Sequence, residues 1–268
     1  MKFTLLLGFG LCAAATAQSI DFKLHSGFLI VVKCSIANIQ DVAAVIDTGV
    51  TETAIDVKLA KRLGLPIKPT RAIFATRESQ VLSVSIPNLV LGALRQAMLN
   101  GIAIDMSAFK RQVGIDAGVI VGMDVLGQTS FLIDYKAKKI TFGAPPPLKY
   151  KSPVTISNHL LLVAAEIGQS KLTLQLDTGF NAILIYGNRL PPSQQGPASR
   201  SETILGSIEV QLTSQPMKIG DWVGHQVTVA VTQAAPGEEN FFDGLLGPQA
   251  IGVRRLAFDN EHHLVLWE

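Results

Sequence analysis

Two identical acidic triplets are the residues in this sequence best suited to do chemistry. Asp-Thr-Gly occurs at residues 47–49 and again at residues 177–179, an offset of 130 residues, and each copy follows a strand-like apolar run. Two carboxylates held close together cannot both ionise cheaply, so they share one proton. One can then accept a proton from water while the other donates one at the same pH. The candidate pair is Asp47 and Asp177.

A single triplet of this kind has a plain structural explanation. In a polar turn after a strand, Asp accepts backbone hydrogen bonds, Thr bonds locally and Gly takes a positive φ. Here, however, the surroundings of the triplet are repeated as well. Three further segments recur in the same order, with offsets that fall from 128 to 125: residues 89–92 with 217–220, 119–122 with 244–247, and 131–134 with 256–259. The order indicates a duplicated unit with short deletions in its second copy.

The N-terminus is typical of an export signal. Lys2 is the only charge before Asp21, an apolar run covers residues 3–14, and small residues stand at Ala15 and Ala17. We expect residues 1–17 to be removed after Ala17. The run is short for a membrane span, and we expect no stable membrane insertion after cleavage. We expect a protein that is periplasmic or secreted.

A proline-rich segment divides the remaining chain. Residues 144–147 read Ala-Pro-Pro-Pro, and prolines cannot donate to a strand ladder, so we expect a stiff linker there. The predicted first unit is residues 18–143 and the predicted second unit is residues 148–268. Cys34 is the one cysteine left after signal removal, which rules out an intrachain disulfide and indicates a buried strand position.

Most of both units is predicted to be β-strand. Short runs rich in β-branched residues are separated by turn signals such as Pro87-Asn88. Helices are predicted at residues 56–63, where Asp56 can cap the first turn, and at residues 123–126. The second unit is expected to lack the first helix because of Pro191-Pro192. The predicted strands lie at residues 42–46, 81–86, 89–91, 101–104, 131–134, 139–142 and 172–176.

The doubled triplets, each followed later by two apolar residues and a glycine, resemble the aspartic proteases of the retropepsin and pepsin type. The resemblance covers nearly the whole mature chain and implies an all-β fold. It implies two similar lobes, each a small closed β-barrel, related by a pseudo-two-fold axis with a cleft between them. The matching segments are residues 47–49 with 120–122 and residues 177–179 with 245–247.

The resemblance also implies a role for each residue of the triplets. Asp47 and Asp177 are then the catalytic carboxylates, sharing a proton across the axis. Thr48 and Thr178 brace the two loops by crossed hydrogen bonds. Gly49 and Gly179 leave room for the backbone to approach, and their amides can donate hydrogen bonds to the carboxylates.

Two features depart from the family pattern. A small residue usually follows the triplet, but Val50 and Phe180 stand there, and Phe180 could narrow the cleft. A covering flap is expected in each unit, at residues 74–80 and at residues 196–202, or else these segments are ordinary exposed loops. The pepsin-type flap carries a tyrosine, and neither of these segments contains one.

Composition excludes other classes of function. Lys and Arg total 23 against 21 Asp and Glu, and no basic run stands out, so we expect no nucleic-acid partner. His262 and His263 fall in a predicted exposed turn without a third ligand, so we expect neither a metal nor a cofactor. The sequence lacks the H-E-x-x-H and G-x-S-x-G motifs.

The sequence therefore predicts an exported aspartic endopeptidase that takes a peptide or protein in a cleft between its lobes. One chain would hold both halves of the site, so the expected species is a monomer. The departures at Val50 and Phe180, with the missing flap tyrosine, leave open a protein that binds peptides without cutting them. A third alternative is that each unit pairs with a second chain.

Overall fold

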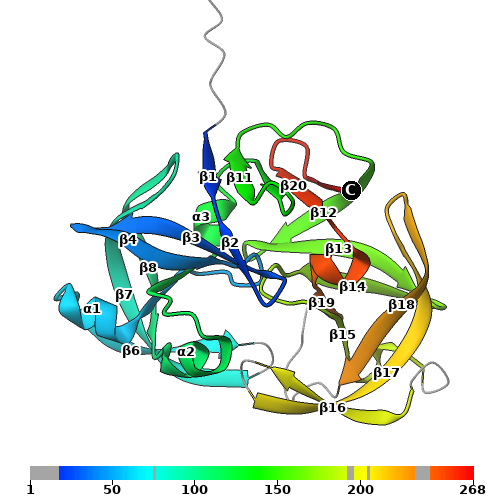
Figure 1. Cartoon of the computed structure of the whole chain (residues 1–268). Coiled ribbons are helices and arrows are strands. Elements are labelled where there is room, and N and C mark those ends of the chain that lie inside the picture. The colour runs from blue at the N-terminus through cyan, green and yellow to red at the C-terminus, as the bar shows by residue number, and fades with distance from the viewer. Residues whose placement is uncertain (1–17, 75–76, 192–195, 204–205, 233–241) are drawn as a thin grey trace, which may run out of the picture.

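The structure is a computed structural model, and it describes residues 18–74, 77–191, 196–203, 206–232 and 242–268 (Figure 1). The described chain is all-β with three short α-helices, which confirms the predicted class. Its strands form one sheet of 13 strands and one of 8. None of the helices in the described ranges has the length and apolar character needed to cross a membrane. We call residues 18–143 the first unit and residues 148–268 the second unit.

Strands of the first unit alternate between buried and exposed positions, as half-buried sheet requires. In β3, for example, Val32, Cys34 and Ile36 are buried while Lys33 is exposed. The strands are β1 (Ser19–Asp21), β2 (Lys23–His25), β3 (Leu29–Ile36), β4 (Ile39–Ile46), β5 (Ala54–Asp56), β6 (Ile67–Phe74), β7 (Arg77–Leu91), β8 (Leu94–Ile104), β9 (Val119–Val121), β10 (Phe131–Asp134) and β11 (Lys139–Phe142).

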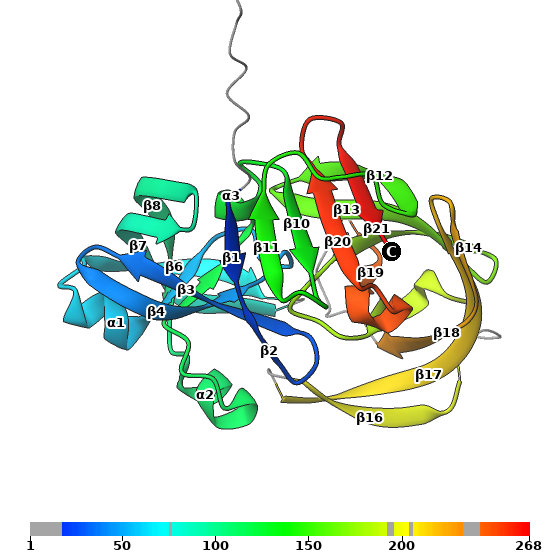
Figure 2. The same cartoon turned by 45° about the horizontal axis from the view of Figure 1, so that its top comes forward.

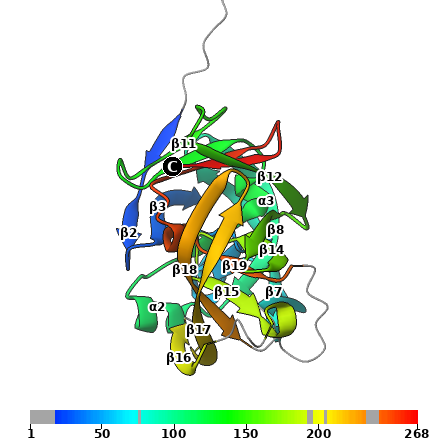
Figure 3. The same cartoon turned by 90° about the vertical axis from the view of Figure 1, so that its right-hand side faces the viewer.

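The second unit follows the same order of strands with a longer first strand. Its β17 and β18 form a long hairpin that curls beside β15 and β19 (Figure 3). The strands are β12 (Tyr150–Ser157), β13 (Leu160–Ile167), β14 (Ser170–Leu176), β15 (Ile183–Tyr186), β16 (Ala198–Thr203), β17 (Gly206–Ile219), β18 (Trp222–Thr232), β19 (Gly244–Leu246), β20 (Arg255–Asp259) and β21 (Leu264–Trp267).

Both predicted helices are present. Helix α1 (Val57–Arg62) begins at Asp56, whose carboxylate accepts a hydrogen bond from the Lys58 amide at 2.6 Å, as an N-cap does. Helix α3 is Met123–Leu126. At the position of α1, the described part of the second unit has a single 3-10 turn, η1 (Gly187–Arg189); another, η3 (Pro248–Ile251), follows β19.

The sequence prediction missed helix α2 (Ser107–Val113). Its Phe109 and the preceding N-cap residue Met106 are buried, and Gly114 ends it in the left-handed conformation with φ of 77°. A glycine directly after an apolar stripe is the usual C-terminal helix signal. The predicted break at Pro87-Asn88 was wrong, because β7 continues through it. Asn88 takes a φ of 47°, so the chain bends there without leaving the sheet.

Strand pairing repeats between the units. In the first, β4 runs parallel to β9, and β9 pairs antiparallel with β5. In the second, β14 runs parallel to β19, and β19 pairs antiparallel with β15. The two Asp-Thr-Gly triplets follow β4 and β14 directly. Equivalent local frames therefore hold them.

A shared set of strands joins the units, in the order β1-β11-β10-β20-β21-β12 (Figure 2). The link is β10 against β20, where Phe131 is paired with Phe258 and their rings lie 5.8 Å apart. The largest core cluster contains buried residues of both units. Each unit is thus packed against the other within one chain.

Core packing explains two other features of the interior. Cys34 is buried, and loss of hydration raises its pKa to about 12, which leaves it an unreactive thiol at neutral pH.

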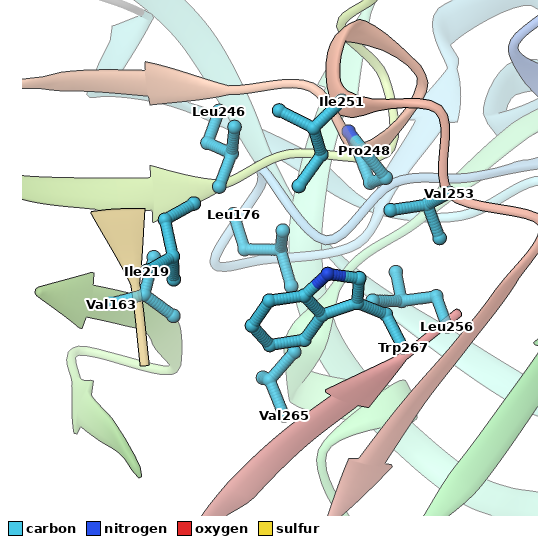
Figure 4. A pocket seen from close by; sticks show the side chains of 10 residues that line it. All are labelled: Val163, Leu176, Ile219, Leu246, Pro248, Ile251, Val253, Leu256, Val265 and Trp267. Carbon is cyan, nitrogen blue, oxygen red and sulfur yellow. The ribbon is translucent and has the colours of Figure 1, made fainter. Parts of the chain in front are cut away.

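A small gap in the second unit has a free volume of about 10 Å³, roughly the minimum for one water. It lies in the apolar interior around Trp267 (Figure 4) and is lined otherwise by Val163, Leu176, Ile219, Leu246, Pro248, Ile251, Val253, Leu256 and Val265.

Some sequence predictions fall outside the described residues. The export signal at residues 1–17 is one of them. The first expected flap, residues 74–80, falls on strands β6 and β7 and is described except for residues 75–76. The second, residues 196–202, is described and falls mostly on β16, which pairs with β17.

Candidate active site

The two triplets start where their strands end, and the neighbouring parallel strand fixes each start. The Asp47 amide donates to the Val121 carbonyl of β9 at 3.1 Å, and the Asp177 amide donates to the Leu246 carbonyl of β19 at 3.0 Å. Each aspartate thus leaves the sheet at a backbone position set by the ladder. Both loops are held the same way although they are 130 residues apart.

Crossed hydrogen bonds join the two loops. The Thr48 amide donates to Oγ1 of Thr178 at 3.0 Å, and the Thr178 amide donates to Oγ1 of Thr48 at 3.0 Å. Each hydroxyl also donates across the junction, Thr48 to the Leu176 carbonyl at 2.9 Å and Thr178 to the Ile46 carbonyl at 3.3 Å. Both threonines are buried, so these bonds fix the loops relative to each other in a low-dielectric setting.

Glycine at the third position of each triplet makes room for the opposite carboxyl group. A Cβ on Gly49 would lie 2.4 Å from Cγ of Asp177, and one on Gly179 would lie 2.5 Å from Oδ2 of Asp47. Each amide also donates to the aspartate of its own loop, Gly49 to Asp47 at 2.7 Å and Gly179 to Asp177 at 2.8 Å. The predicted site residues of both units therefore meet at one place.

The two carboxyl groups are hydrogen-bonded to each other and lie deep among protein atoms, while both residues keep some solvent access. Burial raises the pKa of Asp47, although hydrogen bonds donated by the Gly49 and Gly179 amides oppose the rise. Burial first, and the nearby Asp47 charge second, hold the pKa of Asp177 well above its usual range. Sharing one proton would relieve this conflict, since two adjacent buried charges are costly.

A third carboxyl group, that of Asp124, supports the first loop. Asp124 in α3 accepts from the Thr53 amide at 2.8 Å and from the Thr53 hydroxyl at 2.7 Å. That hydroxyl also accepts from the Gly122 amide at 3.2 Å, and a Cβ on Gly122 would lie 2.8 Å from the Val50 carbonyl. Burial raises the pKa of Asp124 despite the bonds from Thr53. Sequence reasoning missed this pair; an Asp after the apolar-apolar-Gly run was the available signal.

The second loop is supported differently. At the positions of Thr53 and Asp124, the repeat offsets place Ile183 and Gln249. The Gly247 amide donates to the Ala182 carbonyl at 2.8 Å instead of to a side chain. Gln249 hydrogen-bonds Tyr135, at the junction of the units. The backbone frame is kept while the polar support has changed.

Residues that depart from the expected pattern pack into the protein. Phe180 lies against an apolar cluster of the second unit that includes Leu160, Leu162 and Phe242. Val50 is partly buried, and its carbonyl accepts the Met123 amide at 3.0 Å. The three tyrosines contact other aromatic rings within the body of the fold: Tyr135 with Phe22, Tyr150 with Trp267, and Tyr186 with Phe242.

No cluster of three His, Cys, Asp or Glu side chains suited to a metal ion occurs within the described part of the chain. His262 and His263 lie in the exposed turn between β20 and β21. The His262 ring contacts Asp259 at 2.8 Å, and this bond raises the pKa of the imidazole. This turn has no convergent third ligand in the described structure.

Comparison with known proteins bears on the first unit. Residues 32–125 match a family model described as Aspartyl protease, a range that contains the first triplet, β9 and Asp124. The match covers less than half of the chain, and a search of curated proteins gave no match. The family match and the all-β fold together support placing this chain with the aspartyl proteases.

Proposed function

We propose that this chain is an exported aspartic endopeptidase that hydrolyses peptide bonds with a water activated by Asp47 and Asp177. The observation that carries the proposal is the mutual contact of the two triplets, in which each glycine lies against the aspartate of the other loop. Adjacent buried carboxyl groups with raised pKa values are typical of catalytic acid–base pairs. The family match supports a protease.

The proposed mechanism gives the two carboxyl groups complementary states. The two carboxyl groups share one proton in the free enzyme, because burial raises the pKa of both. The ionised member of the pair takes a proton from the attacking water, whose oxygen bonds to the scissile carbonyl carbon. The protonated member donates its proton to the carbonyl oxygen. The acid–base pair then returns a proton to the leaving nitrogen.

The architecture that we propose for this chemistry is two lobes, the first and second units, related by a pseudo-two-fold axis through the triplets. Repeated strand pairing and reciprocal threonine bonds support it. An extended peptide would lie between the lobes. The shared sheet around β10 and β20 favours a monomer as the active species. The apolar segment at residues 3–14 supports export to a periplasm or the medium.

A peptide digest tests the proposal. The purified chain is incubated with a mixed peptide library between about pH 3 and pH 7, the range in which such a pair can share a proton, and products are identified by mass spectrometry. We expect internal cleavage that a statine-type transition-state mimic blocks. The Asp47→Asn variant, purified in parallel, is the matched control and should give no product.

Intact peptides across that pH range would contradict the endopeptidase proposal. Recovery of uncut peptide bound to the chain would instead support a non-catalytic peptide-binding protein on the same fold. Light scattering during the same digest measures the mass of the active species. An active dimer would contradict the monomeric site.

A further inference from the structure

Gln175 is a buried polar residue in a position that is apolar in the other unit. It stands two residues before Asp177 and is only 3% exposed, and its Nε2 donates to the Gly49 carbonyl at 2.6 Å. The bond runs from the second unit to the first triplet. A buried amide so close to the paired carboxyl groups calls for an explanation beyond packing.

The corresponding residue of the first unit is Val45. Both side chains occupy the same place in the sheet: Val45 is paired with Ile120 of β9, and Gln175 with Leu245 of β19. Val45 is 1% exposed and packs in an apolar cluster with Leu29 and Val81. A valine side chain has no donor, so it cannot bind the Gly179 carbonyl as Gln175 binds that of Gly49. The two loops therefore differ in one cross-unit bond.

Gly49 is held by three contacts around the carboxyl pair. Its amide donates to Asp47 at 2.7 Å, its Cα side faces the Asp177 carboxyl group, and its carbonyl accepts from Gln175. Two of these three contacts come from the second unit. Any rotation of the Gly49 peptide would break the Gln175 bond and change the fit against Asp177.

We propose that Gln175 is a positioning residue, which clamps Gly49 against the Asp177 carboxyl group and so makes the two aspartate loops unequal. This inference rests on the proposed protease function. It adds to the different supports beneath the loops one asymmetry that comes from a side chain of the second unit, where the triplets themselves are identical in sequence. Its cost is a buried amide, which is stable only while its hydrogen bond is made.

Two substitutions separate positioning from packing. Gln175→Met keeps the length of the side chain and removes the donor. We expect kcat to fall at least about tenfold at every pH, since a small misplacement of reacting groups costs rate strongly, while KM changes less than kcat. Gln175→Glu keeps the shape and can donate only when protonated. We expect nearly wild-type kcat at acid pH and a steep extra loss as the new carboxyl group ionises beside Asp47 and Asp177.

Val45→Leu is the matched control, because it alters a buried side chain at the mirrored position without changing any hydrogen bond. It should shift the melting temperature and leave unchanged the pH at which kcat falls on the alkaline side of its pH profile. If Gln175→Met fails to fold, the Gln175→Glu profile still decides. If Gln175→Glu keeps wild-type kcat and the same loss of kcat at alkaline pH as the wild type, the inference about Gln175 is overturned. Cleavage by the wild type in the same experiment would still uphold the protease function. A wild type that cleaves nothing would overturn both.

Discussion

The two aspartate loops have the same backbone frame and different side-chain support. In the first loop, the partly buried Asp124 carboxylate accepts two short hydrogen bonds from Thr53. In the second, Ile183 and Gln249 stand at those positions, and a backbone bond between Gly247 and Ala182 closes the loop. The contacts that the loops share hold the two carboxyl groups, and the contacts that differ lie beneath each loop.

The shared part consists of the crossed threonines, the facing glycines and the carbonyls of β9 and β19 that fix each aspartate. These contacts join the loops to each other or to the sheet, so a change in one loop alters both. The different part lies under each loop and contacts only its own unit, apart from Gln175 and Gln249. Substitutions in the shared part should therefore act alike in both units, and substitutions beneath the loops should not.

Apart from the aspartates themselves, the largest expected effect comes from the facing glycines. Gly49→Ala and Gly179→Ala each place a Cβ where a carboxyl group now lies, with calculated approaches of 2.4 and 2.5 Å. Each should lower kcat about 100-fold or more because the carboxyl groups are forced apart. Steady-state kinetics on a cleaved peptide measures this. A large loss in only one of the two variants would break the equivalence of the loops.

The crossed threonines should matter next, and through stability. Thr48→Val and Thr178→Val each remove a buried hydroxyl that both donates and accepts across the junction. We expect each to lower the free energy of unfolding by about 2–3 kcal/mol, the cost of leaving buried partners unpaired. Urea unfolding measures it. The double variant should lose less than the sum, because losing either hydroxyl loosens the same loop junction and weakens the bonds that the other hydroxyl makes there. Fully additive losses would contradict the coupling of the loops.

The supports beneath the loops should respond unequally. Asp124→Ala leaves the Thr53 amide and hydroxyl without their acceptor and should cost about 2 kcal/mol of unfolding free energy. Gln249→Ala, its matched control in the second unit, removes a neutral bond to Tyr135 and should cost about 1 kcal/mol. Thermal and urea unfolding measure both. Equal losses would show that the two loops depend on these positions alike.

The smallest expected effect is in the pH dependence of stability. Asp47, Asp124 and Asp177 have raised pKa values in the folded protein, so the folded state holds their protons more tightly. Their stabilising contribution is complete below about pH 3.9, the ordinary pKa of Asp, and is lost as the pH rises through their folded values. The lowered pKa values of Asp105 and Asp259 act in the opposite direction at more acid pH.

Asp124→Asn should flatten part of that decline and Asp177→Asn a larger part. Unfolding free energies at about pH 4 and pH 7 measure the slope for each variant and for the wild type. A wild type whose carboxyl-linked stability increases between these values would contradict the raised pKa values.

Much of the fold was predictable because it follows from local sequence. The strands β10 and β11 match their predicted bounds, and Asp56 caps α1 as expected. The break predicted at Pro87-Asn88 was wrong, because pairing with β8 continues on both sides and a positive φ at Asn88 is tolerated. Helix α2 was missed because its apolar stripe is short and its N-terminus has no side-chain cap.

For the site, duplication led directly to Asp47 and Asp177, since the same triplet recurred in the same context. The support residues were harder to find. Asp124 and Gln175 act through contacts 71 and 126 residues away in the sequence, so the residues around them do not identify their partners. Gln175 was visible only as a polar residue inside an apolar strand, which becomes informative once Val45 is known to occupy the mirrored place.

The most direct test of the central claim is a kinetic cycle on the carboxyl pair. The specificity constant kcat/KM is measured for the wild type, Asp47→Asn, Asp177→Asn and the double variant on one cleaved peptide. If the two carboxyl groups act as one proton-sharing unit, each single substitution removes nearly all activity, about 1000-fold or more, and the double variant is no worse. A single variant that keeps wild-type turnover, or losses that simply add, would contradict the account.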